Sequence, residues 1–191
     1  MKGRFNNYNA FGIELEILIP HNLSQQNIVD RISAAGIDCR MEGYNHRTVS
    51  YWKMTTDCTV KALGLSGYYY GNNELVSPKL EGQSGKRKLK KVLEVLNELG
   101  CRVNKTCGTH VHHDVTDTML KSKEVVTTFL NNLIKTVIKY EHIIYRLIAP
   151  SRLKKIGSGW WTLPARYVFG KIGDWNCEGT LTIESITKTV K

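Results

Sequence analysis

Apolar and polar residues alternate between Phe11 and Ile19. Every odd position in this stretch is apolar: Phe11, Ile13, Leu15, Ile17 and Ile19. A period of two predicts a β-strand with one buried face. Glu14 and Glu16 occupy even positions, so both carboxylates project from the other face. Pro20 is expected to end the strand.

Two later stretches follow helical spacing. Ser24 can cap the first helix, which ends at Gly36. Its core-facing residues are Ile28, Ile32 and Ala35. Ser84 can cap the second helix, which ends at Gly100. Its apolar positions are Leu89, Val92, Leu93, Leu96 and Leu99.

Two regions flanking the second helix predict strands. Residues 48–76 are rich in Val, Tyr, Trp and Thr and are broken by glycines and by Gly71-Asn72-Asn73, which is typical of strands joined by turns. Residues 102–114 predict a further strand, in which alternation places His110 and His112 on one side. His113 falls on the opposite side, where we expect it to be packed or hydrogen-bonded.

The last third of the chain predicts a long helix followed by a loop region. Apolar pairs recur from Thr118 to Ile148 at helical spacing, which indicates one helix with a buried face. Pro150 is expected to end it. Residues 151–179 have no clear period and predict an ordered loop with a short strand near Tyr167. A final alternation predicts a strand that presents Glu184.

Size and composition favour one soluble domain. With 191 residues and 41% apolar content, the chain can bury one core, so we expect a single domain over residues 1–191, shortened at its C-terminal end. The sequence has no run of eighteen apolar residues and no signal-peptide pattern, which favours the cytoplasm, or the host cytoplasm if a phage encodes the chain. The five cysteines form no Cys-x-x-Cys pair and are expected to be reduced thiols.

The chain is strongly basic. Its 27 Lys and Arg against 17 Asp and Glu give a net charge of +10, which favours polyanionic partners such as nucleic acid, acidic polymers or a nucleotide triphosphate. The densest cluster is Lys86-Arg87-Lys88 with Lys90 and Lys91. Because it lies on a predicted amphipathic helix, a solvated helix face is favoured over a binding patch.

The carboxylate pair of the first strand is accompanied by other motifs. Two carboxylates at this spacing can share a hard divalent cation, although such a pair alone more often faces solvent. The motifs are Gly12-Ile13-Glu14-Leu15-Glu16, Asn73-Glu74-Leu75-Val76-Ser77-Pro78, Cys107-Gly108-Thr109-His110-Val111-His112, Ala149-Pro150-Ser151-Arg152, and Arg166-Tyr167 ahead of Glu184. In this order they resemble the amidoligase branch of the glutamine-synthetase and glutamate-cysteine-ligase superfamily. The resemblance covers Phe11 to Glu184.

The resemblance implies a fold, an activity and a site. The fold is α+β, with a curved antiparallel sheet around a funnel and helices packed on one face. The activity is ATP- and Mg²⁺-dependent joining of a small-molecule or peptide carboxylate to an amine through an acyl phosphate. The implied catalytic residues are Glu14, Glu16, Glu74, Arg166 and Glu184. The implied metal ligands are Glu14, Glu16, Glu74 and His110, and the implied cofactor-binding residues are His110, His112 and Arg152.

Two positions leave alternatives open. The family has an arginine two residues after the last glutamate, whereas Ile186 stands two residues after Glu184. Either another arginine substitutes, or the copy is degenerate, or the chain closes differently. Asp57 lies where the family has an aspartate after a strand that here contains Trp52, and a turn role is equally consistent with it.

Two other functions compete with the ligase. The absent arginine and the positive charge favour an inactive basic protein that binds nucleic acid or an acidic polymer. Three histidines in one strand, with Cys107 before them, favour a metal-dependent hydrolase that holds zinc. The oligomeric state cannot be predicted from these patterns.

Overall fold

The computed structural model describes residues 10–147 of the chain. Six strands and four helices occur in this range: β1 (Ala10–Pro20), α1 (Gln25–Ala34), β2 (Cys39–Met41), β3 (Trp52–Thr55), β4 (Tyr69–Val76), β5 (Leu80–Glu81), α2 (Gly82–Glu98), β6 (Thr109–His113), α3 (Thr116–Met119) and α4 (Lys123–Leu147). The α+β class is confirmed. The predicted end of the long helix at Pro150, the loop 151–179 with its short strand, and the last strand lie outside the described residues.

The six strands form one mixed sheet with β1 at its centre. Glu14 pairs with Val76 of β4 and with His110 of β6, so β1 lies between these two strands. β5 continues from β4 and pairs with the start of β1. All pairings of β1 and β4 are antiparallel, whereas β2 and β3 are parallel. The predicted antiparallel sheet is therefore confirmed for most strand pairs but not for this edge, and the funnel-like curvature stays a prediction.

The predicted turn at Gly71-Asn72-Asn73 is a β-bulge inside β4. The register between β1 and β4 shifts between Ile17 and Ile19, and Asn72 has a φ of 65°. Asparagine tolerates this left-handed conformation better than most residues. Gly71 also lacks room for a side chain, because a Cβ there would lie 2.3 Å from the carbonyl oxygen of Val60. A turn-like sequence therefore bends this strand without ending it.

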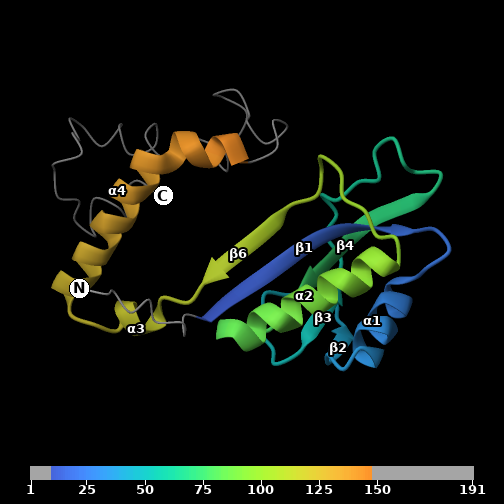
Figure 1. Ribbon diagram of the computed structural model, residues 1–191, viewed down its shortest axis with the longest axis horizontal. Helices are drawn as coiled ribbons and strands as arrows, with labels where there is room; N and C mark the ends of the chain where they lie inside the picture. Colours follow the sequence, from blue (N-terminus) through green and yellow to red (C-terminus); the bar gives the residue numbers. More distant parts are fainter. Residues whose placement is uncertain (1–9, 148–191) are drawn as a thin grey trace. The chain divides into compact units, whose positions relative to one another are not determined.

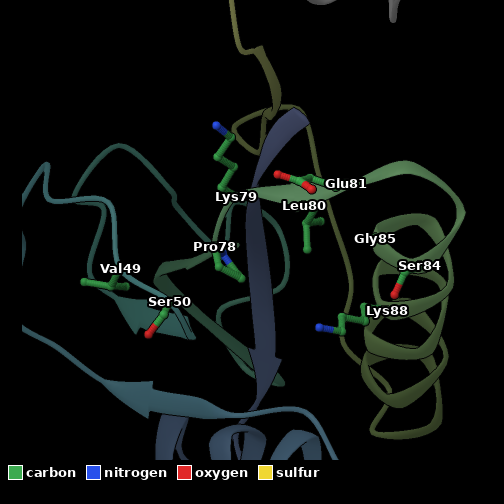
Figure 2. A pocket seen from close by; sticks show the side chains of 9 residues that line it. All are labelled: Val49, Ser50, Pro78, Lys79, Leu80, Glu81, Ser84, Gly85 and Lys88. Atoms are coloured by element: carbon green, nitrogen blue, oxygen red, sulfur yellow. The ribbon is translucent and has the colours of Figure 1, made fainter. Parts of the chain in front are cut away.

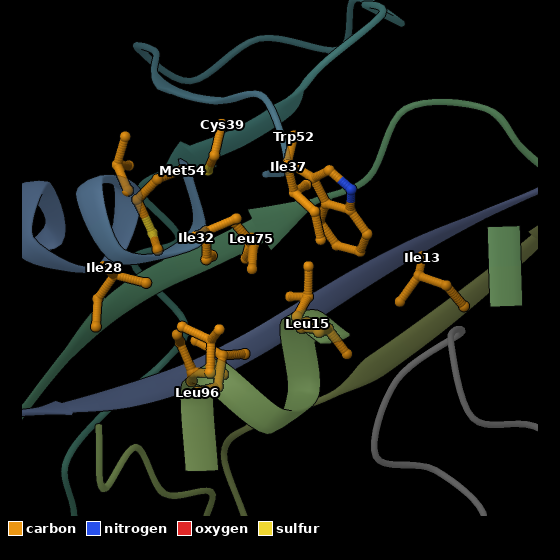
Figure 3. Packing of buried hydrophobic residues seen from close by; sticks show 14 of the residues in the cluster. Ile13, Leu15, Ile28, Ile32, Ile37, Cys39, Trp52, Met54, Leu75 and Leu96 are labelled. Carbon is orange, nitrogen blue, oxygen red and sulfur yellow. The ribbon is translucent and has the colours of Figure 1, made fainter. Parts of the chain in front are cut away.

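The hydrophobic core lies between the sheet and the helices α1 and α2 (Figure 1). The odd-numbered residues of β1 that the alternation predicted to be buried pack here with Trp52 and Leu75. Ile32 from α1 and Leu96 from α2 point into the same cluster (Figure 3). Burial of each such side chain contributes about 1.5–3 kcal/mol. Since both helices cover this face, the polar positions of the strands are left on the opposite face.

Three of the four predicted helix ends are confirmed. Ser24 caps α1 in a capping box with Asn27, and the glycines at 36 and 100 adopt positive φ just after the two helices. Ser84 is not a cap, because α2 begins at Gly82 directly after Glu81, which makes no side-chain cap. Because β5 ends its short pairing with β1 at Glu81, α2 begins at Gly82, two residues before Ser84.

The strand predicted over residues 102–114 is shorter than expected. Only Thr109–His113 form β6, and Arg102 makes an isolated bridge to Leu18. His113 is exposed rather than packed, and the alternative that it is hydrogen-bonded stays a prediction. Cys39, Cys58 and Cys101 are free thiols, as predicted.

The chain divides into two compact units, Met1–Asp114 and Val115–Lys191, and the single-domain organisation stays a prediction. In the second unit the predicted single helix is interrupted at residues 120–122, so that α3 and α4 are separate. The hydroxyl of Ser122 accepts a hydrogen bond from the N–H of Val125 at 3.4 Å and thereby starts a new helix.

Within residues 10–147, no helix combines the length and the apolar character that a membrane crossing requires.

Candidate active site

Acidic and basic side chains gather on the face of the sheet opposite α1 and α2. Side chains of directly paired residues point to the same face. The register therefore places Lys53, Val76, Glu14 and His110 in one row across β3, β4, β1 and β6. The next row holds Thr55, Glu74 and Glu16. We call this surface the carboxylate face.

Three carboxylates converge on this face. Glu16, Asp57 and Glu74 each offer one oxygen, and these oxygens lie within 4.8 Å of one another. Asp57 follows β3 by two residues, and its Oδ1 accepts hydrogen bonds from the N–H and the hydroxyl of Thr59, both at 2.7 Å. Asp57 therefore belongs both to a turn and to the carboxylate group. An all-oxygen set of this kind suits a hard cation such as Mg²⁺ or Ca²⁺ better than zinc.

The backbone at Gly108 holds Glu16 in place. Glu16 is 7% exposed, and its Oε2 accepts a hydrogen bond from the N–H of Gly108 at 2.6 Å. A Cβ at position 108 would lie 3.2 Å from Oε1 of Glu16 and 3.1 Å from Nε2 of His110. These separations are shorter than ordinary contacts, so a side chain at this position would displace the ends of Glu16 and His110 by a few tenths of an ångström.

Two histidines of β6 bracket Glu14. Nδ1 of His110 lies 3.0 Å from one oxygen of Glu14, and Nε2 of His112 lies 3.2 Å from the other. Both imidazoles are more than half exposed. Glu14 and His110 were predicted to be metal ligands, but neither belongs to the group of converging oxygens. They lie beside it and contact each other, and His110 Nε2 is 3.8 Å from Glu16.

Burial, together with the nearby acidic groups, raises the pKa of Glu74 to about 7, above its ordinary value of 4.5. Burial is the largest cause, and the charges of Glu14, Asp57 and Glu16 add to it, while His110 acts in the opposite sense. Like charges held together in a partly buried place disfavour ionisation. A bound cation would relieve this repulsion.

A buried hydroxyl also lacks a partner beside this group. Thr55 is 1% exposed, and its Oγ1 makes no hydrogen bond with any residue in the described part of the chain. Thr55 is paired with Glu74, so its side chain is on the carboxylate face. Leaving a buried hydroxyl unsatisfied costs about 1–3 kcal/mol. Together, the clustered carboxylates and this hydroxyl fit a site that takes a hydrated cation.

The structure therefore brings most of the predicted site residues together. Those that share the carboxylate face are Glu14, Glu16, Glu74, His110 and His112. Arg152, Arg166 and Glu184 lie outside the described residues. Thr55 was missed, and its Thr-x-Asp spacing to Asp57, directly after a strand, is the signal that could have suggested it.

A pocket of about 450 Å³ lies elsewhere in the first unit (Figure 2). It is lined by Ser50, Pro78, Lys79, Glu81, Ser84 and Lys88, among others. None of the converging carboxylates lines it. The converging carboxylates therefore lie outside this pocket, although Val49 and Ser50 of the connection between β2 and β3 line it.

Residues 8–158 match the protein family described as "Putative amidoligase enzyme". No curated protein and no solved structure matches the chain. The matched range includes all six strands of the sheet and hence the whole carboxylate face. Arg152 lies inside the matched range, and Arg166 and Glu184 lie beyond it.

Proposed function

The chain belongs to the amidoligase family, and we propose that it uses ATP and Mg²⁺ to join a carboxylate to an amine. In this reaction an oxygen of the substrate carboxylate attacks the γ-phosphorus of ATP, and ADP leaves. The amine nitrogen then attacks the acyl carbon, phosphate leaves, and the nitrogen loses a proton. The net change is an amide bond formed and one ATP cleaved to ADP and phosphate.

The main support is the convergence of Glu16, Asp57 and Glu74 on one face. These residues would hold Mg²⁺, which when bound offsets the negative charge of the approaching phosphate and carboxylate. Burial and repulsion from the neighbouring carboxylates raise the pKa of Glu74 to about 7. A bound cation would relieve this repulsion. The hydroxyl of Thr55 would accept or donate a hydrogen bond to water around the cation.

The two imidazoles above Glu14 have a separate role in this proposal. His110 and His112 are more than half exposed on the carboxylate face, and each contacts one oxygen of Glu14. When the imidazole is doubly protonated, its second ring nitrogen also carries an N–H, which can donate to a phosphate or carboxylate oxygen. Glu14 thus acts as an orienting residue for the histidines.

The test is an ATP-cleavage assay with pooled carboxylates and amines in the presence of Mg²⁺. Wild-type protein should release ADP and phosphate and form amide products, and Glu16→Gln and Glu74→Gln should each reduce the rate at least 100-fold. Glu98→Gln is a matched control, because Glu98 is an exposed carboxylate on α2, on the helix side of the sheet. Equal rates for wild type, Glu16→Gln and Glu74→Gln would contradict the proposal.

A second candidate function is polyanion binding by the exposed side of α2. Its basic residues are Lys86, Arg87, Lys88, Lys90 and Lys91, and all are exposed. This surface is on the helix side of the sheet, away from the carboxylate face. Binding of nucleic acid through it should weaken steeply with salt and should be indifferent to Glu74→Gln. Salt-independent binding, or none, would exclude this function.

A further inference from the structure

The connection between β2 and β3 crosses the carboxylate face. The two strands are parallel neighbours, so the chain must return past the sheet between them. The hydrogen bonds of Lys53 show over which face of the sheet this connection passes. Its side chain is on the carboxylate face, and its Nζ donates hydrogen bonds to the carbonyl oxygens of Asn45 and Arg47, each at 2.9 Å.

The connecting segment Glu42–Tyr51 is a compact loop closed by its own side chains. The carboxylate of Glu42, where the loop begins, accepts hydrogen bonds from the hydroxyl of Tyr51, where the loop ends, and from Nδ2 of Asn45. Oδ1 of Asn45 accepts a further hydrogen bond from the N–H of Arg47 at 3.0 Å. Closely spaced ends and internal packing are the features of an Ω-loop, a type of loop that often carries function.

Lys53 fixes this loop to the sheet. Lys53 is 3% exposed, and its ammonium has three donors and three acceptors, the third acceptor being Oδ1 of Asn45 at 3.1 Å. Burying an ammonium is costly unless it is fully hydrogen-bonded. Because every donor is used by the loop, Lys53 cannot also bind a ligand. It is a positioning residue.

The loop carries a cation that is not fixed in this way. The side chain of Arg47 is 76% exposed, and its ion pair with Glu42 is long, at 3.8 Å. The Glu42 side chain is 12% exposed and already accepts hydrogen bonds from Asn45 and Tyr51. Because Arg47 itself is largely in solvent and its contact with Glu42 is long, this ion pair is weak, so the guanidinium can exchange Glu42 for a ligand. Lys53 pairs with Val76, which pairs with Glu14, so Lys53 and Glu14 are two strands apart in the sheet. This spacing corresponds to a backbone separation of about 10 Å. Since the backbone of Arg47 is bonded to Lys53, Arg47 starts at the margin of the carboxylate face.

We propose that the loop Glu42–Tyr51, fastened by Lys53, is the wall of the active site on the β3 side and that Arg47 binds phosphate oxygens of the nucleotide. The inference rests on the proposed ligase function. A planar guanidinium can bind two phosphate oxygens at once. Carboxylates alone cannot neutralise a triphosphate, so the site needs such a cation. Arg47, on the loop fastened by Lys53, supplies this cation.

The experiment measures binding of the Mg²⁺ complex of a non-hydrolysable ATP analogue by calorimetry. Arg47→Gln should weaken binding about 10- to 100-fold, and Arg47→Lys should recover part of the loss. Arg31→Gln on α1 is the matched control, because Arg31 is also exposed, with a 3.8 Å ion pair, on the helix side of the sheet. Binding to Arg31→Gln should equal binding to wild type. Mn²⁺ alone should bind wild type and Arg47→Gln equally.

Lys53→Met separates positioning from direct binding. Amide hydrogen exchange across residues 42–51 should become faster in Lys53→Met, and nucleotide affinity should fall, while Mn²⁺ affinity is retained. If wild type and Arg47→Gln bind the nucleotide equally well, this inference is overturned and the ligase proposal stands. If wild type binds no nucleotide, the ligase proposal fails, and this inference fails with it. Unchanged exchange in Lys53→Met would overturn the fastening role.

Discussion

Glu74 offers a direct test of the electrostatics of the carboxylate face. Its folded pKa of about 7 lies above the ordinary value of 4.5, so the folded state binds more protons than the unfolded state between these two pH values. Stability of the metal-free protein should therefore fall as pH rises through this window. The interval corresponds to about 3 kcal/mol. Solvent screening at this half-buried carboxyl reduces the expectation to about 1–2 kcal/mol.

The perturbation is Glu74→Gln, which keeps the shape of the side chain and removes its charge. At pH 8 with chelator, the variant should be about 1–2 kcal/mol more stable than wild type, which corresponds to a melting temperature higher by about 2–8 °C. At pH 4, below the ordinary pKa of 4.5, the difference should nearly vanish, because Glu74 is then mostly protonated in both the folded and the unfolded protein. Glu98→Gln, on an exposed helix surface, should show no such pH dependence.

Adding Mg²⁺ at pH 8 should reverse the order of stability. At about 100 times its dissociation constant, a ligand stabilises the folded state by about 2.7 kcal/mol, and only wild type has the full set of carboxylates. The assay is thermal unfolding at pH 4 and pH 8, with chelator or with Mg²⁺. The reasoning is refuted if metal-free Glu74→Gln is less stable than wild type at pH 8, or if the two differ equally at both pH values.

Four further substitutions test the site, the core and the helix caps. Gly108→Ala should weaken Mn²⁺ binding about tenfold at nearly unchanged stability, because the new Cβ would crowd Glu16; an unaltered dissociation constant would argue against the close approach. Leu75→Ala should lower the free energy of unfolding by about 2–5 kcal/mol in urea titrations, because Leu75 is fully buried in the core; a loss below 1 kcal/mol would be inconsistent with this packing. Ser24→Ala should cost about 0.5–2 kcal/mol, whereas Ser84→Ala should be nearly neutral, because only the first serine caps a helix. Equal losses for the two serines would count against the observed start of α2.

Local patterns were sufficient to predict the parts of the fold that depend on near neighbours in sequence. The alternation from Phe11 to Ile19 predicted β1 and its buried face, and Ser24 predicted the start of α1. The same alternation placed Glu14 and Glu16 on one face, and the spacing of His110 and His112 did so for β6. These predictions succeed because side-chain direction along a single strand follows from its period of two.

Only the tertiary structure decided which of these faces meet and what joins them. The register of β4 against β1 places Glu74 beside Glu16, and the turn after β3 adds Asp57. The parallel pairing of β2 with β3, which no local pattern indicated, brings the loop held by Lys53 over the carboxylate face. Register and crossover depend on pairings between residues far apart in the chain, and a single sequence contains no periodic signal for them.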